Sequence, residues 1–216
     1  MTRVYFVRHG ESVANAGGVT MDHAVIPLSP LGLVQAQAIA TVLDVVPSKV
    51  LVSAYTRARQ TAQPFCDKAG CRAEVHPLLH EFSALDPALV EGMTGEQRRP
   101  ITAAYWHMAD PAVRMGESAE TFLEFNARVT DFVTELARLP DRCVLFGHGI
   151  WFGLLAWHLL GFGASDSQGM KGFRGFQLAL PMPNCAVYVL EIGPGQRWSW
   201  YADEQAMRRM AVIRLS

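Results

Sequence analysis

Short apolar runs of strand type alternate with helical segments along most of the chain. The runs at 4–7 (VYFV), 49–53 (KVLVS) and 142–146 (RCVLF) are rich in β-branched and aromatic residues, and each precedes a stretch of helical composition. Strands that alternate with helices favour a parallel arrangement in which helices cover the sheet. The sequence therefore predicts an α/β fold: a single three-layer domain with a mostly parallel central sheet, helices on both faces, and an inserted loop and helix region.

The helical segments carry their own boundary signals. Ser29 followed by Pro30 predicts a helix start, and Gly70 predicts the end of a helix over 56–69. We expect Ser118 to cap a long helix whose apolar stripe includes Phe122, and an apolar helix over 147–160. In the first helix the expected apolar stripe consists of Leu31, Val34, Ala38 and Leu43. We also expect a weak strand at 72–75. An antiparallel hairpin is expected around the sequence GPGQ, with strands at 185–192 and 197–201.

Residues 77–117 lose this alternation. Prolines and glycines interrupt the segment, and only a short helix near 97–108 is expected in it. We find no linker, repeat or low-complexity segment elsewhere. The economical interpretation is one domain over 1–216, with an insertion at about 77–117 that forms a lid over the substrate.

Charge and composition exclude several classes of partner. The 216 residues carry a net charge of −1, so no global field favours nucleic acid or an anionic membrane. The longest apolar run is too short to span a bilayer, and no signal peptide precedes the first strand. The four cysteines have neither disulfide-framework nor zinc-site spacing. We expect a cytoplasmic protein with no nucleic-acid and no membrane partner.

Polar side chains follow three of the expected strands at the point where each strand ends. Arg8 and His9 follow the first strand, Arg57 comes shortly after the second, and His148 with Gly149 follows a late strand. Because ligands bind beyond the carboxyl ends of such strands, we expect these groups to meet at one edge. Guanidinium groups and a helix N-terminus both favour phosphate oxygens. The sequence therefore predicts a site for a phosphate dianion.

The same residues carry a resemblance to a known family. The motif VRHGES is followed by Asn15. Further motifs come after it in this order: LSPLG at 28–32, S-x-x-x-R-A-x-x-T at 53–61, GES at 116–118 with Phe122 and Arg128, and a late GHG. In these motifs the chain resembles the histidine phosphatase superfamily, which includes cofactor-dependent phosphoglycerate mutase. The matches run over nearly the whole length.

The resemblance implies a role for each residue at the strand ends. His9 would be the nucleophile that takes the phosphoryl group, with its other ring nitrogen held by a backbone carbonyl. Arg8, Arg57 and His148 would hold the phosphoryl oxygens. Further phosphate contacts are expected from Asn15, Gly149 and Ser12; for Ser12, capping of the turn is an equally good interpretation.

The general acid is assigned less directly. Glu81, in LLHEFSALD, matches the acid of the family, but extra residues separate it from the EG pair that normally follows soon after. Asp86 and Glu91 are therefore kept as alternatives. Arg98 and Arg99 either hold a second anionic group of the substrate or form a solvated helix face, and the sequence favours the solvated face.

These assignments imply a metal-independent phosphomonoester hydrolase. It would act through a phosphohistidine intermediate on a small phosphorylated metabolite, release inorganic phosphate, and need no cofactor. Two alternatives remain open: phosphoglycerate mutase-type phosphoryl transfer, and a non-catalytic module that binds a phosphorylated ligand. Residues 82–117 do not resemble the basic and aromatic insertion of the mutases, which favours hydrolysis.

Overall fold

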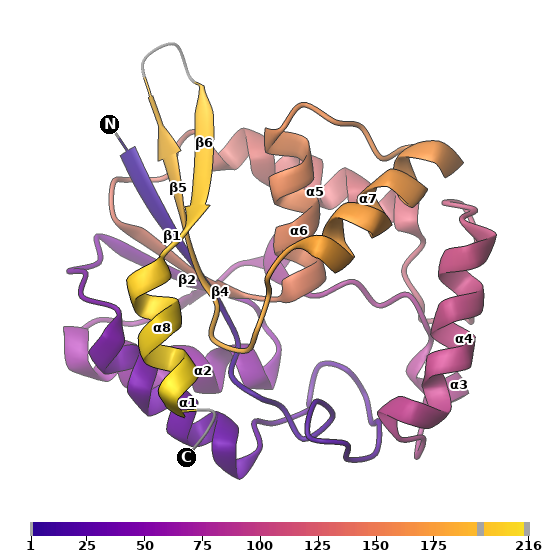
Figure 1. Ribbon diagram of the computed structural model, residues 1–216, viewed down its shortest axis with the longest axis horizontal. Coiled ribbons are helices and arrows are strands. Elements are labelled where there is room, and N and C mark those ends of the chain that lie inside the picture. Colours follow the sequence, from indigo (N-terminus) through magenta and orange to yellow (C-terminus); the bar gives the residue numbers. More distant parts are fainter. Residues whose placement is uncertain (1, 194–196, 214–216) are drawn as a thin grey trace.

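One six-stranded sheet organises the protein. The structure is a computed structural model and describes residues 2–193 and 197–213. In this part of the chain the strand order is β3–β2–β4–β1–β5–β6 (Figure 1). The strands are β1 (Thr2–Arg8), β2 (Lys49–Val52), β3 (Glu74–Val75), β4 (Cys143–Gly147), β5 (Val187–Ile192) and β6 (Trp198–Ala202).

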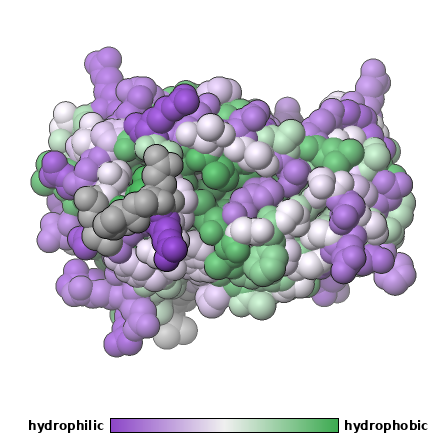
Figure 2. All heavy atoms as spheres, turned by 90° about the horizontal axis from the view of Figure 1, so that it is seen from above, coloured by the Kyte–Doolittle hydropathy of each residue, from purple (hydrophilic) through white to green (hydrophobic). Residues whose placement is uncertain are grey.

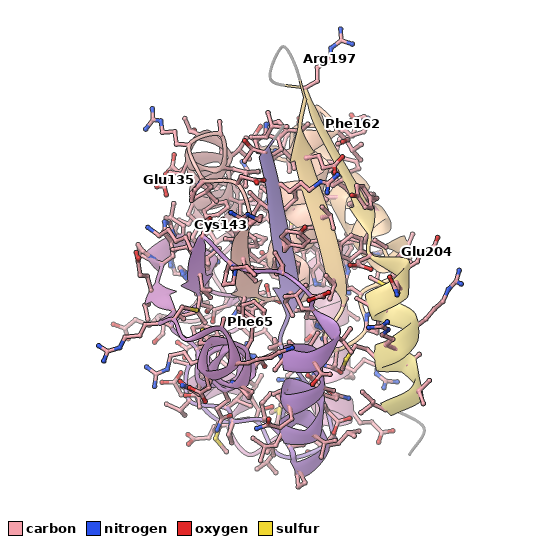
Figure 3. All side chains as sticks on the ribbon, turned by 90° about the vertical axis from the view of Figure 1, so that its left-hand side faces the viewer. Phe65, Glu135, Cys143, Phe162, Arg197 and Glu204 are labelled. Carbon is pink, nitrogen blue, oxygen red and sulfur yellow. The ribbon has the colours of Figure 1, made fainter. Side chains whose placement is uncertain are left out.

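The sheet is mostly parallel, as expected. Strands β3, β2, β4 and β1 pair in parallel, and β5 pairs antiparallel with both β1 and β6. The hairpin of β5 and β6 is confirmed, while most of its GPGQ turn lies outside the described residues. In Figure 3, Arg197 projects from the end of this hairpin away from the body of the protein.

The register brings three strand ends to the same level. Arg8 at the end of β1 lies opposite Gly147 at the end of β4, and Val52 at the end of β2 lies opposite Phe146. The residues that follow these positions therefore leave the sheet side by side.

Helices cover both faces of the sheet. Helices α1, α2 and α8 pack on one face, and α5, α6 and α7 on the other (Figure 1). The helices are α1 (Pro30–Val42), α2 (Thr56–Ala69), α3 (Pro87–Val90), α4 (Gly95–Met108), α5 (Phe122–Leu136), α6 (Gly149–Leu159), α7 (Ser167–Ala179) and α8 (Glu204–Ile213).

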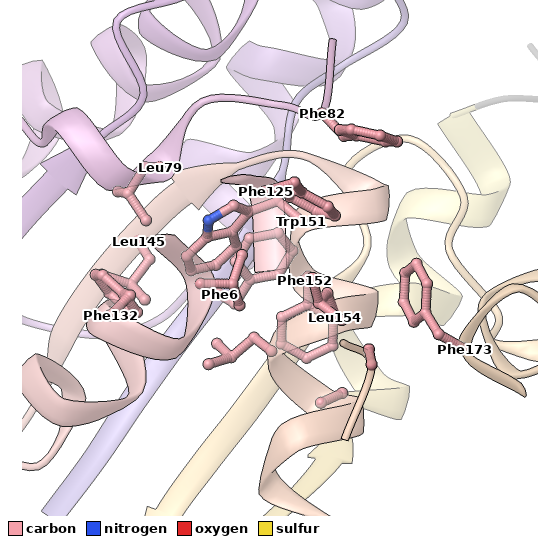
Figure 4. Packing of buried hydrophobic residues seen from close by; sticks show 14 of the residues in the cluster. Phe6, Leu79, Phe82, Phe125, Phe132, Leu145, Trp151, Phe152, Leu154 and Phe173 are labelled. Carbon is pink, nitrogen blue, oxygen red and sulfur yellow. The ribbon is translucent and has the colours of Figure 1, made fainter. Parts of the chain in front are cut away.

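The alternation of side chains along β1 divides the core in two. Phe6 faces α5 and α6, whereas Val7 faces α1 and α2. Phe6 stacks on Phe152 with 4.3 Å between ring centroids, and Trp151 packs beside Phe132 (Figure 4). This aromatic cluster buries the N-terminal half of α6 and so fixes the position of its first turn.

Three expectations about the helices are corrected. In α1 the buried face consists of Gly32, Gln35, Ala36, Ile39 and Ala40, whereas Val34 is 56% exposed. The long helix α5 is capped by Thr121 and not by Ser118, because Thr121 forms a capping box with Glu124. Helices α7 and α8 were not expected.

The segment 77–117 adds no strand to the sheet. It contains a 3₁₀ turn at Pro77–Leu79, the short α3, and α4, which begins with a capping box of Thr94 and Gln97. In Figure 1, α3 and α4 lie to the side of the layers formed by the other helices.

Across 2–193 and 197–213, no helix is both long enough and apolar enough to cross a bilayer. Figure 2 shows hydrophilic residues projecting around the outline, with hydrophobic residues nearer the middle of that face.

Candidate active site

The two histidines of the candidate site lie side by side at the ends of β1 and β4. The main-chain N–H of His9 donates to the carbonyl of Gly147 at 3.0 Å, which continues the β1–β4 pairing by one residue. The rings of His9 and His148 lie 5.2 Å apart between centroids, and both side chains are buried. The structure thus brings together residues that the sequence placed on separate strands.

Hydrogen bonds define the tautomer of His9. Its Nδ1 lies 2.6 Å from the carbonyl oxygen of Gly10, and the Nε–H of Arg57 points at its Nε2 from 3.2 Å. A carbonyl only accepts and a guanidinium only donates. Nδ1 therefore carries the proton, and Nε2 presents a lone pair on a neutral ring.

Burial and neighbouring charges keep both histidines neutral. Burial is the main cause that lowers the pKa of His9 well below its ordinary value, and the positive charges of Arg57 and Arg8 lower it further. The pKa of His148 is lowered in the same direction by burial, then by Arg57 and His9. A cluster of this kind favours an anion, because an anion relieves the repulsion among the cations.

Arg57 is held from two sides. Its Nη1 donates to the carbonyl of His23 at 2.6 Å, and its guanidinium lies 4.9 Å from the ring centroid of Tyr55. The side chain lies in the first turn of α2 and is 7% exposed. Fixed in this way, the guanidinium is a preorganised charge beside His9.

Arg8 reaches the first turn of α6. Its Nη1 donates to the carbonyl of Met182. A Cβ added to Gly149 would lie 3.4 Å from the Nε of Arg8, so the glycine lets the guanidinium approach the helix N-terminus. Both residues line the cavity that contains His9.

His148 is oriented by the end of β2. Its Nε2 lies 2.8 Å from the hydroxyl of Ser53, and its Nδ1 is buried without a hydrogen-bond partner in the described residues. The edge of its ring also faces Tyr55, at 5.1 Å between centroids.

The loop after His9 is tied to α2 and folded on itself. The hydroxyl of Thr61 accepts from the N–H of Gly10 at 3.0 Å and donates to the carbonyl of Arg57. Ser12 and Asn15 cap each other, since each side chain accepts from the other's main-chain N–H at 3.2 Å. Both residues also line the cavity, where Asn15 is exposed and Ser12 is buried.

Glu81 sits at the N-terminus of α6. Its carboxylate accepts from the main-chain N–H groups of Ile150 at 3.0 Å and Trp151 at 2.9 Å. Its own neighbour Phe82 donates a third such bond. The carboxylate lines the same cavity as His9.

The two alternative acids lie elsewhere. Asp86 caps α3 and accepts from the N–H groups of Ala88 and Ser118, which are the main causes that lower its pKa. Glu91 is exposed. Both line a larger neighbouring cavity of about 810 Å³ and not the one that contains His9. Of these three carboxylates, Glu81 is the one that lines the cavity that contains His9.

The candidate cavity encloses about 360 Å³. Its polar end consists of the residues at the strand ends, and segment 77–117 supplies much of the remaining lining, including Phe82 and Trp106. Tyr105 is buried in the core behind it.

Arg98 and Arg99 have different environments, which corrects half of the expectation for this pair. Arg99 is exposed, as a solvated helix face requires, but Arg98 is half-buried and lines the cavity. His80 is likewise half-buried and lines the larger cavity.

Some residues near the site were not singled out from the sequence. His23 lines both cavities, Tyr55 contacts Arg57 and His148, and the side-chain amide of Asn184 donates to Asn15. None lies directly at a strand end. Of the three, only Tyr55 could have been found from the sequence, because it lies between Ser53 and Arg57 of the motif at 53–61.

No metal-ligand cluster is found among the described residues: no three or more His, Cys, Asp or Glu side chains are grouped to hold an ion.

Comparison with known proteins gives consistent matches. The model of the histidine phosphatase superfamily (branch 1) matches residues 4–202. The chain is 31% identical over 144 residues to an adenosylcobalamin/alpha-ribazole phosphatase of Salmonella typhi, across 64% of this chain and 69% of that protein. It is 30% identical over 178 residues to a probable phosphoglycerate mutase of Enterobacter sp. (strain 638), across 79% and 80%. A solved mycobacterial glucosyl-3-phosphoglycerate phosphatase in complex with VO3 superimposes with a TM-score of 0.71 at 26% identity, across 94% of this chain and 98% of that one.

Proposed function

The chain belongs to the histidine phosphatase superfamily, and from that premise we propose that it hydrolyses phosphomonoesters through a phosphohistidine on His9. The observation that carries the proposal is the tautomer of His9: Nδ1 is anchored on Gly10, and the lone pair of Nε2 lies beside the guanidinium of Arg57. A neutral imidazole whose Nε2 carries no proton is the form that attacks phosphorus.

In the first step Nε2 of His9 attacks phosphorus in line with the ester oxygen. The N–P bond forms, the P–O bond to the leaving group breaks, and its electron pair goes to the leaving oxygen. As the N–P bond forms, Nε2 loses its lone pair, and the hydrogen bond from the Nε–H of Arg57 shifts from Nε2 to a phosphoryl oxygen while Arg57 keeps its proton. Arg8, His148, Asn15 and the first turn of α6 at Gly149 supply further donors.

Glu81 donates the proton that the leaving oxygen needs. It lines the cavity with His9 and is held by the first turn of α6, the element that also carries Gly149. In the second step a water molecule transfers a proton to the carboxylate of Glu81, which restores the acid, and its oxygen attacks phosphorus. The N–P bond breaks, its electron pair returns to Nε2, and inorganic phosphate leaves.

Segment 77–117 acts in this proposal as the lid that surrounds the leaving group of a small phosphorylated metabolite. Support comes from Phe82, Val90 and Trp106, which line the same cavity as the residues at the strand ends. We further propose a cytoplasmic location, supported by four cysteines that form no disulfide within the described residues.

The alternative is phosphoryl transfer of the mutase type, because one relative is named a probable phosphoglycerate mutase. Hydrolysis is favoured because the Salmonella and mycobacterial relatives are named phosphatases. The third possibility, a non-catalytic binding module, is disfavoured because nucleophile, arginines and acid share one cavity.

The test is release of phosphate from para-nitrophenyl phosphate in excess chelator, by the wild type, His9→Ala and the exposed control His107→Ala. We expect a loss of at least about 1000-fold in His9→Ala only, and an acid-labile phosphoryl adduct on the wild-type peptide that contains His9. Isomerisation of 3-phosphoglycerate that needs a bisphosphoglycerate primer and outpaces phosphate release would favour the mutase. No turnover of any ester by the wild type would favour the binding module.

A further inference from the structure

One face of α4 lines the cavity that contains His9. Arg98, Thr102 and Trp106 are spaced by four residues, so they lie on the same side of the helix, and all three line the cavity with His9. Arg99 lies about 100° further round the helix and is exposed. The neighbouring arginines of α4 therefore form a natural pair for comparison.

Among the described residues, the charge of Arg98 has no acidic partner. Its Nη1 donates to the hydroxyl of Thr20 at 3.1 Å, and burial is the cause that lowers its pKa. Across residues 2–193 and 197–213, no carboxylate forms an ion pair with it. A half-buried cation of this kind is costly unless an anion from outside completes it.

The charges around the cavity do not balance. Its lining contains three arginines and one carboxylate, namely Arg8, Arg57, Arg98 and Glu81. The transferred phosphoryl group accounts for Arg8 and Arg57 at the strand ends. Arg98 comes from α4, close enough that its positive charge also lowers the pKa of Arg57. One cation of the cavity is therefore left for a second anionic group.

The cavity also has an apolar part. Phe82, Leu85, Val90 and Trp106 line it, and each is less than 9% exposed. Arg174 lies over the ring of Trp106 at 4.5 Å, which holds that ring in place. An apolar, well-ordered wall of this kind fits a flat or aliphatic body better than a sugar with many hydroxyl groups.

We propose that the cavity selects phosphomonoesters whose leaving group combines an apolar, ring-sized body with a second anionic group, and that Arg98 is the residue that binds this anion. The inference rests on the proposed function, since it assigns the leaving-group side of the same cavity. The phosphoryl group lies at the strand ends, the body on Phe82 and Trp106, and the carboxylate or second phosphate at Arg98.

Matched aryl phosphates test the proposal. The kcat/KM values of meta-carboxyphenyl phosphate and its neutral isostere meta-carbamoylphenyl phosphate are compared in the wild type, Arg98→Gln and Arg99→Gln. We expect a preference for the carboxylate of about 10-fold or more in the wild type and in Arg99→Gln, and a ratio near one in Arg98→Gln. Arg98→Glu should instead prefer meta-aminomethylphenyl phosphate, a gain that damage to the fold would not produce.

The outcomes separate this inference from the proposed function. Equal turnover of the carboxylate and carbamoyl esters by an active wild type would overturn the role of Arg98 and leave the hydrolase intact. The same would follow if Arg98→Gln and Arg99→Gln changed the ratio alike. Absence of turnover, or full activity in His9→Ala, would overturn the proposed function and this inference with it.

Discussion

The Nε of Arg57 lies 3.2 Å from Nε2 of His9, so a permanent cation is directed at the lone pair of a buried imidazole. This contact is compatible only with the neutral ring, because Nε2 cannot accept from Arg57 and carry a proton at the same time. Protonation of His9 would therefore break the hydrogen bond from Arg57 and would also place a charge in a buried site.

The first prediction concerns pH and stability. The folded-state pKa values of His9 and His148 are lowered, whereas in the unfolded chain they return to about 6.5. Above that pH neither state binds protons at these rings. As the pH falls below it, the unfolded chain binds protons that the folded protein excludes, so the free energy of unfolding decreases. The slope is at most about 1.4 kcal/mol per pH unit for each ring.

Urea unfolding at a series of pH values between neutral and mildly acidic would measure this slope. His9→Gln should flatten it, and His9→Gln with His148→Gln should flatten it further. Part of the slope will remain, because the pKa values of His23, His80 and His158 are lowered as well. An unchanged slope in the double variant would contradict the neutral pair.

The second prediction concerns Glu81 as the proton donor. A good leaving group such as para-nitrophenolate needs little protonation, whereas an alkoxide needs it fully. Glu81→Gln should therefore lower kcat for alkyl phosphates by about 100-fold or more, and for para-nitrophenyl phosphate far less. Equal losses on both substrates would remove Glu81 from the role of acid. Glu91→Gln, which changes an exposed carboxylate outside the cavity, is the matched control.

The third prediction assigns Arg128 as a positioning residue for Glu81. Its Nη1 donates to the carbonyls of Leu78 and His80 at 3.1 and 2.8 Å, and its guanidinium forms two hydrogen bonds with the carboxylate of Glu120. Arg128→Gln should lower stability by about 3 kcal/mol, because the pair is largely buried. It should also reduce turnover of alkyl phosphates more than that of para-nitrophenyl phosphate.

A parallel loss on both substrates would indicate that Arg128 acts on the fold alone. The control is Arg114→Gln, which breaks a more exposed pair with Glu124 and should change neither stability nor the substrate ratio by much.

The fourth prediction explains the glycine of the LSPLG motif. A Cβ on Gly32 would lie 1.9 Å from the carbonyl oxygen of Glu11, in the loop that follows His9. Gly32→Ala should therefore lower stability by at least about 2 kcal/mol and displace the loop. Gly175→Ala in α7 meets no atom within 4 Å and should raise stability by about 0.5–1 kcal/mol. Thermal unfolding of both variants checks the opposite signs.

The central sheet could be predicted from the sequence because its strands are short, apolar and followed by polar residues. The same reasoning placed Arg8, His9 and His148 near one another, since parallel strands end at one edge. Their catalytic roles stay predictions. The buried face of α1 was wrong because that helix is apolar on nearly every side, so its sequence gives no clear direction.

Other features depended on information that the sequence pattern does not contain. Helix α7 has glycines at 169, 172 and 175, which weaken the helical pattern, and tertiary packing of Met170 and Phe173 compensates. Ser118 and Thr121 are both plausible caps by residue type, and only the reciprocal bonds with Glu124 decide between them. Arg98 and Arg99 have identical side chains, so their environments follow from where α4 packs.

The position of β1 has a consequence for how the protein is made. It precedes the other strands of this sheet in the sequence, yet it lies between β4 (Cys143–Gly147) and β5 (Val187–Ile192), which are synthesised much later. Until both emerge from the ribosome, Phe6 and Val7 have no sheet partner to cover them. Long-range pairing of this kind slows folding and exposes apolar strands to aggregation. A nascent chain of this protein therefore carries β1 without its β5 partner until residues 187–192 have been synthesised.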